Sequence, residues 1–89
     1  EASRMLTWKA ASEADAGVKN TESAAHAKRF SSDAAMKIST DAVQVYGGYG
    51  YSEEYPVARL MRAAKVMQIY EGSSQVQRMI IGREITKNL

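Results

Sequence analysis

The sequence of 89 residues contains no cysteine and a single histidine, His26. Without cysteine the chain has no disulfide framework, no thiol nucleophile and no zinc ribbon. His26 has no second histidine or cysteine to pair with, so we interpret it as a solvated surface residue. Because cysteine is absent and histidine occurs once, the sequence predicts no metal centre. Long apolar runs are also missing, so it predicts no membrane span and no signal peptide.

Charge of one sign is not in excess either. Lys and Arg number 12 against 10 Asp and Glu, which gives a formal net charge of +2, and the two signs are interspersed along the chain. Nucleic-acid-binding domains carry clustered basic residues. We therefore expect no nucleic-acid partner.

Proline occurs only once and glycine six times, which leaves long segments free for helices. The apolar spacing predicts helices over residues 4–16 and about 22–46, and a third helix that begins at Pro56. Gly17 is expected to end the first helix, and Asn20 to provide the N-cap of the second.

Ser74 and Gln77 match a capping box ahead of a last helix that runs towards Leu89. Taken together, residues 1–89 are predicted to form one all-α unit, an antiparallel helical bundle. The chain begins at Glu1 without an initiator methionine or a capping signal, so we expect a bundle that is truncated at its N-terminus.

The helix over residues 22–46 is predicted to be amphipathic. Its apolar stripe consists of Ala27, Phe30, Ala34, Ile38, Ala42 and Val45. Its opposing polar stripe consists of Glu22, His26, Arg29, Asp33, Lys37, Thr40 and Gln44. The apolar stripe is rich in alanine, which would let a neighbouring helix approach closely.

Two segments are candidates for chemistry. In residues 44–51 (QVYGGYGY), the glycines form either a helix C-cap followed by a turn, or a place where Gly47 and Gly48 let a ligand approach the backbone. In residues 70–75 (YEGSSQ), Glu71 precedes a helix N-terminus. It is either a partner of the helix dipole, or a carboxylate held beside an anionic or polarised group.

Four segments together resemble the C-terminal helical domain of the acyl-CoA dehydrogenase family. They are residues 41–51 (DAVQVYGGYGY), 54–57 (EYPV), 62–65 (RAAK) and 68–78 (QIYEGSSQVQR). Residues 4–7 and 15–17 are also similar to helices that precede these motifs. The resemblance implies an FAD-dependent enzyme that desaturates an acyl-CoA between Cα and Cβ and passes electrons to an electron-transfer flavoprotein.

The resemblance also implies roles for single residues. Glu71 matches the base that removes the α-proton, its backbone N–H would polarise the thioester carbonyl, Gly72 leaves room for the acyl-CoA, and Arg83 is expected near the CoA portion. The residues that match FAD contacts are Ser73, Ser74 and Gln75, and, for the FAD of a neighbouring subunit, Gln44, Val45, Tyr46, Gly47 and Gly48. A homo-oligomer, a dimer of dimers in the full-length enzyme, is implied as well.

The sequence departs from the family pattern at two positions. Ala63 stands where the family usually has Asp, which would remove a structural ion pair, and Ser73 replaces a commoner Thr. The presence of Glu71 points to the short-chain, medium-chain or glutaryl-type branches.

The family's N-terminal helical domain and middle β-domain do not fit into 89 helical residues, so we expect the chain alone to be inactive. The expected location is the cytoplasm of a prokaryote, with the mitochondrial matrix as the alternative. The alternative functions are an acyl-CoA oxidase and a non-catalytic helical oligomerisation module.

Overall fold

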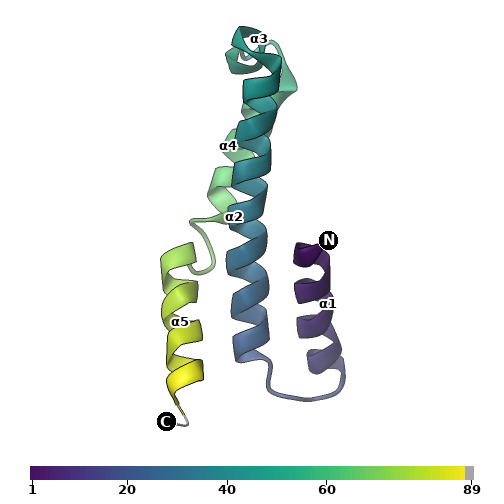
Figure 1. The fold of residues 1–89 in the computed structure, drawn as a ribbon, viewed down its shortest axis with the longest axis vertical. Helices are drawn as coiled ribbons and strands as arrows, with labels where there is room; N and C mark the ends of the chain where they lie inside the picture. Colours follow the sequence, from purple (N-terminus) through teal and green to yellow (C-terminus); the bar gives the residue numbers. More distant parts are fainter. Residues whose placement is uncertain (88–89) are drawn as a thin grey trace.

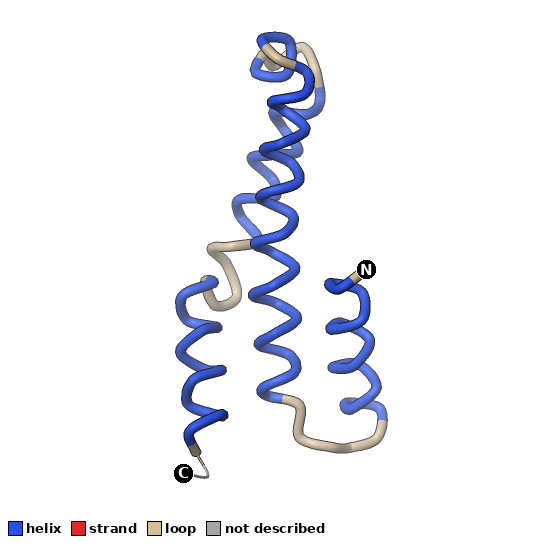
Figure 2. Tube along the Cα trace, in the orientation of Figure 1, coloured by secondary structure: helices blue, strands red, loops and turns tan. Residues whose placement is uncertain are grey.

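The computed structural model describes residues 1–87, and these form five helices and no strand (Figures 1 and 2). The helices are α1 (Ala2–Asp15), α2 (Thr21–Tyr46), α3 (Gly48–Tyr51), α4 (Pro56–Met67) and α5 (Ser74–Thr86). The predicted all-α class is confirmed. The predicted end of the last helix at Leu89 lies outside the described residues.

The long helix α2 is the axis of the molecule (Figure 1). At 26 residues it is about 39 Å long, and the molecule measures 50 × 23 × 18 Å. Helix α1 runs antiparallel along one side of its lower half, while α4 and α5 run antiparallel to its upper and lower halves, one after the other. All four other helices contact α2, and within residues 1–87 α5 packs against no helix but α2.

Small residues form the core. Within the described residues, the buried positions are Ala10, Ser23, Ala25, Ser32, Ala64, Ser74 and Gln77. The predicted apolar stripe of α2 is only partly buried, because Ile38 is 68% exposed and Val45 is 86% exposed. Trp8 on α1 is also 60% exposed. The four helices that contact α2 leave much of its upper half uncovered.

The connection between α1 and α2 lies where the sequence predicts it, but Asn20 does not cap α2 through its side chain. Gly17 has a φ of +70° just after the end of α1, and Asn20 occupies the N-cap position of α2. The Asn20 side chain makes no capping hydrogen bond; its Nδ2 instead donates to the Ala10 carbonyl oxygen at 2.9 Å. The Asn20 side chain therefore connects the start of α2 to α1 and does not cap α2.

A short helix replaces part of the loop that we expected after α2. Gly47 adopts a φ of +65°, and α3 then forms a single turn before Pro56 begins α4. Gly50 in α3 is buried against α2: a Cβ at this position would lie 2.5 Å from the Val43 carbonyl oxygen and 2.7 Å from the Tyr46 Cβ. The close packing of α3 against α2 therefore requires a glycine at position 50.

No helix formed by residues 1–87 is both long enough and apolar enough to cross a lipid bilayer. These residues also contain no cluster of three or more His, Cys, Asp or Glu side chains that could hold a metal ion.

We expect Gly50→Ala to lower the free energy of unfolding by about 1–3 kcal/mol, because the added methyl group overpacks the contact between α3 and α2. The matched control is Gly48→Ala, since a Cβ at Gly48 would meet no atom within 4 Å. The control should change stability by less than about 1 kcal/mol. Urea unfolding followed by circular dichroism measures both variants, and equal stability of the two would contradict this account of the packing.

Candidate functional site

The connection between α4 and α5, residues 68–73, carries the candidate catalytic residue; we call it the α4–α5 turn. The Ser74 backbone N–H closes its base by donating to the Gln68 carbonyl oxygen at 3.1 Å. At its apex Glu71 has a φ of +55° and Gly72 a φ of +90°. The left-handed region costs a non-glycine residue about 1–2 kcal/mol, so the surrounding structure must hold Glu71 in this conformation.

One carboxylate of α2 joins the two ends of the turn. Asp33 Oδ1 accepts hydrogen bonds from Gln68 Nε2 at 2.7 Å and from Ser74 Oγ at 2.8 Å. Asp33 Oδ2 pairs with the guanidinium groups of Arg78 at 3.3 Å and Arg29 at 3.9 Å. The predicted polar stripe contained Asp33 without assigning it a function. Gln68, Ser74 and Arg78 lie 35 to 45 residues away in the chain, so helical spacing alone gave no signal of this cluster.

The cluster sets the charge state of Asp33. Partial burial raises the pKa of the Asp33 carboxyl group, but hydrogen bonds from Ser74 and Gln68 and the charges of Arg78 and Arg29 outweigh it. The pKa of Asp33 therefore lies below its usual value, and the group is ionised at neutral pH.

A lysine of α2 holds the start of the same turn. Lys28 Nζ donates to the carbonyl oxygen of Met67, the last residue of α4, and lies 5.5 Å from the centre of the Tyr70 ring. Lys28 also lines an open cavity of about 360 Å³ with Thr21, Ala24, Ala25, Glu71, Gln77 and Ile80. Glu71 is exposed at this cavity. Within residues 1–87, its backbone N–H donates to no carbonyl group.

Ser73, Ser74 and Gln75 line a different cavity. This second cavity, of about 370 Å³, is also lined by Asp33, Lys65, Gln68, Ile69 and Arg78. The α4–α5 turn thus contributes Glu71 to one cavity, while Ser73 and the first two residues of α5 line another.

The predicted capping box is wrong by one residue. Ser73, not Ser74, is the N-cap of α5, and its Oγ accepts a hydrogen bond from the Val76 backbone N–H at 3.3 Å. Ser74 is buried, and its hydroxyl group donates to Asp33. Gln77 turns its amide towards the turn, with Nε2 3.4 Å from the carbonyl oxygens of Glu71 and Gly72. Two adjacent serines made both registers compatible with the sequence.

The second group of predicted cofactor contacts lies at the far end of α2. Gln44, Val45, Tyr46, Gly47 and Gly48 are all exposed there. Since Asp33 touches the α4–α5 turn, the helical rise places Gln44 to Tyr46 about 17–20 Å farther along α2, and Gly47 and Gly48 follow the end of that helix. One copy of the chain does not bring the two groups together.

Arg83 lies on α5, nine residues beyond Ser74 and therefore about 14 Å along the helix. Its guanidinium group is 3.5 Å from Glu84, which also lies 3.9 Å from both Lys19 and Lys87. The Arg83 side chain is 67% exposed.

Comparison with known proteins identifies the family. The family model for the C-terminal domain of acyl-CoA dehydrogenases matches residues 1–86. The chain belongs to the acyl-CoA dehydrogenase family. It is 55% identical, over 98% of its length and 23% of the relative, to cyclohexane-1-carbonyl-CoA dehydrogenase of Geobacter metallireducens.

Solved structures agree with this assignment. Butyryl-CoA dehydrogenase of Megasphaera elsdenii superposes with a TM-score of 0.90 and 56% identity, over 94% of this chain and 22% of that one. A chain in a structure that concerns the electron transferring flavoprotein of Acidaminococcus fermentans superposes with a TM-score of 0.94 and 48% identity, over 98% and 23%. The chain spans about a quarter of the length of the curated relatives it matches.

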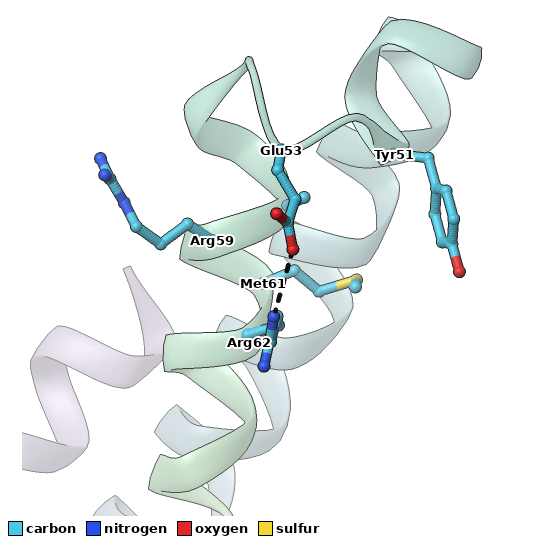
Figure 3. A pocket seen from close by; sticks show the side chains of 6 residues that line it. Tyr51, Glu53, Arg59, Met61 and Arg62 are labelled. Atoms are coloured by element: carbon cyan, nitrogen blue, oxygen red, sulfur yellow. Dashed lines mark ion pairs between the residues drawn. The ribbon is translucent and has the colours of Figure 1, made fainter.

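Members of the acyl-CoA dehydrogenase family use FAD. Ala63, one of the two positions at which we expected a departure from the family pattern, is exposed on α4. Its neighbour Arg62 keeps an ion pair, with Glu53 at 3.8 Å (Figure 3). These two residues line a cavity of about 600 Å³ beside α3, together with Tyr51, Ala58, Arg59 and Met61. Tyr51 and Arg59 point away from each other there, so these side chains do not converge on a common ligand (Figure 3).

We expect the Asp33 cluster to weaken in acid. Because the folded-state pKa of Asp33 is lowered, its stabilisation is complete above the unfolded-state pKa and is lost as the pH falls through the folded-state value, below about 4. Comparing urea unfolding at pH 7 and pH 3, wild type should lose about 1 kcal/mol more than Asp33→Asn. An equal loss in both proteins would show that the cluster adds no stability.

Proposed function

We propose that this chain is the C-terminal helical domain of a longer FAD-dependent acyl-CoA dehydrogenase, which forms a double bond between Cα and Cβ of an acyl-CoA thioester. The observation that carries the proposal is the α4–α5 turn, which presents the Glu71 carboxylate from a left-handed backbone at an open cavity. We infer that an N-terminal helical domain and a middle β-domain complete the enzyme, and that residues 1–89 alone are inactive.

Glu71 is assigned the removal of the α-proton. The α-proton of a thioester is weakly acidic, so the carbonyl must be polarised and the base must be desolvated. The Glu71 backbone N–H donates to no carbonyl within the described residues, which leaves it available to the thioester oxygen. Glu71 is exposed here, and we assign its desolvation to bound substrate and the other domains.

The acyl-CoA is assigned to the side of the turn that carries Glu71. Gly72 has no side chain to obstruct it, and the exposed Arg83 is assigned to the CoA portion. The named relatives act on butyryl-CoA and cyclohexane-1-carbonyl-CoA. We therefore infer a substrate from the short-chain, medium-chain or cyclic acyl-CoA class.

Two observations support the assignment of the predicted cofactor contacts to FAD. A Cβ at Gly47 or Gly48 would meet no atom of the chain within 4 Å, so the backbone is open to a ligand. Ser73, Ser74 and Gln75 lie at the N-terminus of α5 and line one cavity, and helix N-termini favour anionic groups. Bound at these residues, FAD would supply the acceptor for the β-hydrogen, which leaves as hydride.

The distance between the two FAD-contacting groups supports an oligomer. We infer that Gln44, Val45, Tyr46, Gly47 and Gly48 contact the FAD of a neighbouring subunit, in a homotetramer arranged as a dimer of dimers. The exposed Ile38 and Val45 on the same helix supply apolar area for that contact.

We infer that an electron-transfer flavoprotein accepts the electrons, because one structural neighbour comes from a structure that concerns such a flavoprotein. The relatives named above are bacterial, which supports the cytoplasm of a prokaryote as the location. Rapid reoxidation of the reduced enzyme by air would instead indicate an acyl-CoA oxidase.

The experiment that tests the function is anaerobic addition of butyryl-CoA to the full-length, flavin-loaded protein. Wild type should bleach the flavin absorbance, and Glu71→Gln should retain flavin but bleach at least about 100-fold more slowly, because it lacks the base. Glu22→Gln, an exposed Glu of α2, is the matched control and should behave as wild type. Equal bleaching by Glu71→Gln would exclude Glu71 as the base, and a full-length protein without flavin would indicate a non-catalytic helical module.

The FAD assignment at Gly48 has its own test. Because the chain itself has room for a Cβ at Gly48, we expect Gly48→Ala to keep its stability but to bind FAD at least about tenfold more weakly, through contact with the cofactor. Gly82→Ala on α5 is the matched control, since a Cβ there also meets no atom within 4 Å. Flavin titration of the full-length apoprotein measures both. If Gly48→Ala binds FAD as tightly as wild type, the cofactor does not contact this segment.

A further inference from the structure

We propose that Asp33 is a positioning residue for the reaction, which fixes the place of Glu71 without touching the substrate. This inference rests on the proposed function, because it concerns the geometry of the base named there. It arises from one observation. The Asp33 carboxylate on α2 accepts hydrogen bonds from Gln68, at the start of the α4–α5 turn, and from Ser74, just after its end.

The other contacts of the turn do not hydrogen-bond both of its ends to α2. The hydrogen bond between Ser74 and Gln68 closes the turn upon itself and does not place it against α2. Lys28 donates to the last carbonyl of α4 and lies against the Tyr70 ring, while Gln77 of α5 donates over 3.4 Å to the Glu71 and Gly72 carbonyl oxygens. Asp33 is thus the α2 side chain that hydrogen-bonds to both ends of the turn, and the position of the Glu71 backbone relative to α2 depends in large part on it.

The cluster requires a carboxylate and not merely a polar group. Oδ1 accepts from an amide and a hydroxyl group, while Oδ2 faces the guanidinium groups of Arg78 and Arg29. An asparagine would offer one acceptor oxygen, and its NH₂ group would face Arg78 or displace one of the two neutral donors. The Asp33→Asn variant is therefore expected to retain part of the attachment, and Asp33→Ala none of it.

A small displacement of Glu71 has a large effect on rate. Misplacing a reacting group by about 1 Å can reduce a rate about 100-fold. Under the proposed function, most of the acyl-CoA is bound away from the turn, by the other domains and, at the CoA portion, by Arg83. Loss of Asp33 should thus lower the rate of α-proton removal and leave the affinity for acyl-CoA nearly unchanged.

The test measures proton removal directly, as exchange of the α-protons of butyryl-CoA with D₂O in the full-length, flavin-loaded protein. Rates are expressed per bound flavin, so that loss of folded protein does not contribute. Asp33→Ala should slow exchange at least about tenfold, Asp33→Asn should be intermediate, and the half-saturating butyryl-CoA concentration should stay within about threefold of wild type. Asp15→Asn, the same chemical change at an exposed position on α1, is the control and should match wild type.

The inference is overturned if flavin-loaded Asp33→Ala exchanges within about twofold of wild type, even when it unfolds more easily. If Asp33→Ala does not fold, the same criterion applies to Asp33→Asn. Failure of the proposed function gives a different result: Glu71→Gln then exchanges as fast as wild type, and the role of Asp33 falls with it.

Discussion

The arrangement of the C-terminal half depends on the carboxylate of Asp33. Helices α4 and α5 contact α2 and not each other, and Asp33 is the α2 side chain that hydrogen-bonds to both ends of the turn between them. Removing part of the hydration from a carboxylate is unfavourable, and the Gln68, Ser74, Arg78 and Arg29 donors offset that cost. Because all four donors must be in place together, the cluster favours one register of α5 against α2.

The arrangement of the other helices around α2 leaves the C-terminal end of α2 loosely packed. Alanine and serine form most of the core, so the helices approach closely but bury little apolar area per residue. Ile38 and Val45 remain in solvent in a single copy. Exposed apolar side chains of this kind are typical of a surface that another domain or chain covers, and this chain spans about a quarter of the length of its relatives.

The sequence was sufficient to predict the helices, because capping residues and apolar periodicity are local signals. Pro56 began α4 as expected, and α2 ended at Tyr46, next to Gly47. The three glycines of residues 47–50 were interpreted as a loop, although Gly50 permits a tight helical turn against Val43. Asp33 could not be singled out, because its spacing from Arg29 and Lys37 matched a solvent-facing stripe, and its decisive partners come from another part of the chain.

Glu71 was singled out by sequence, but its backbone conformation was not. A glutamate followed by glycine normally places the left-handed conformation on the glycine, whereas here both residues adopt it. Residues held in unfavourable backbone regions persist only where surrounding contacts determine them, and such residues concentrate at functional sites. The Asp33 cluster and the closed base of the α4–α5 turn supply those contacts. Contacts with α2 thereby hold the Glu71 backbone in an unfavourable conformation, and this fixes the position of the Glu71 carboxylate. A catalytic base requires such a fixed position.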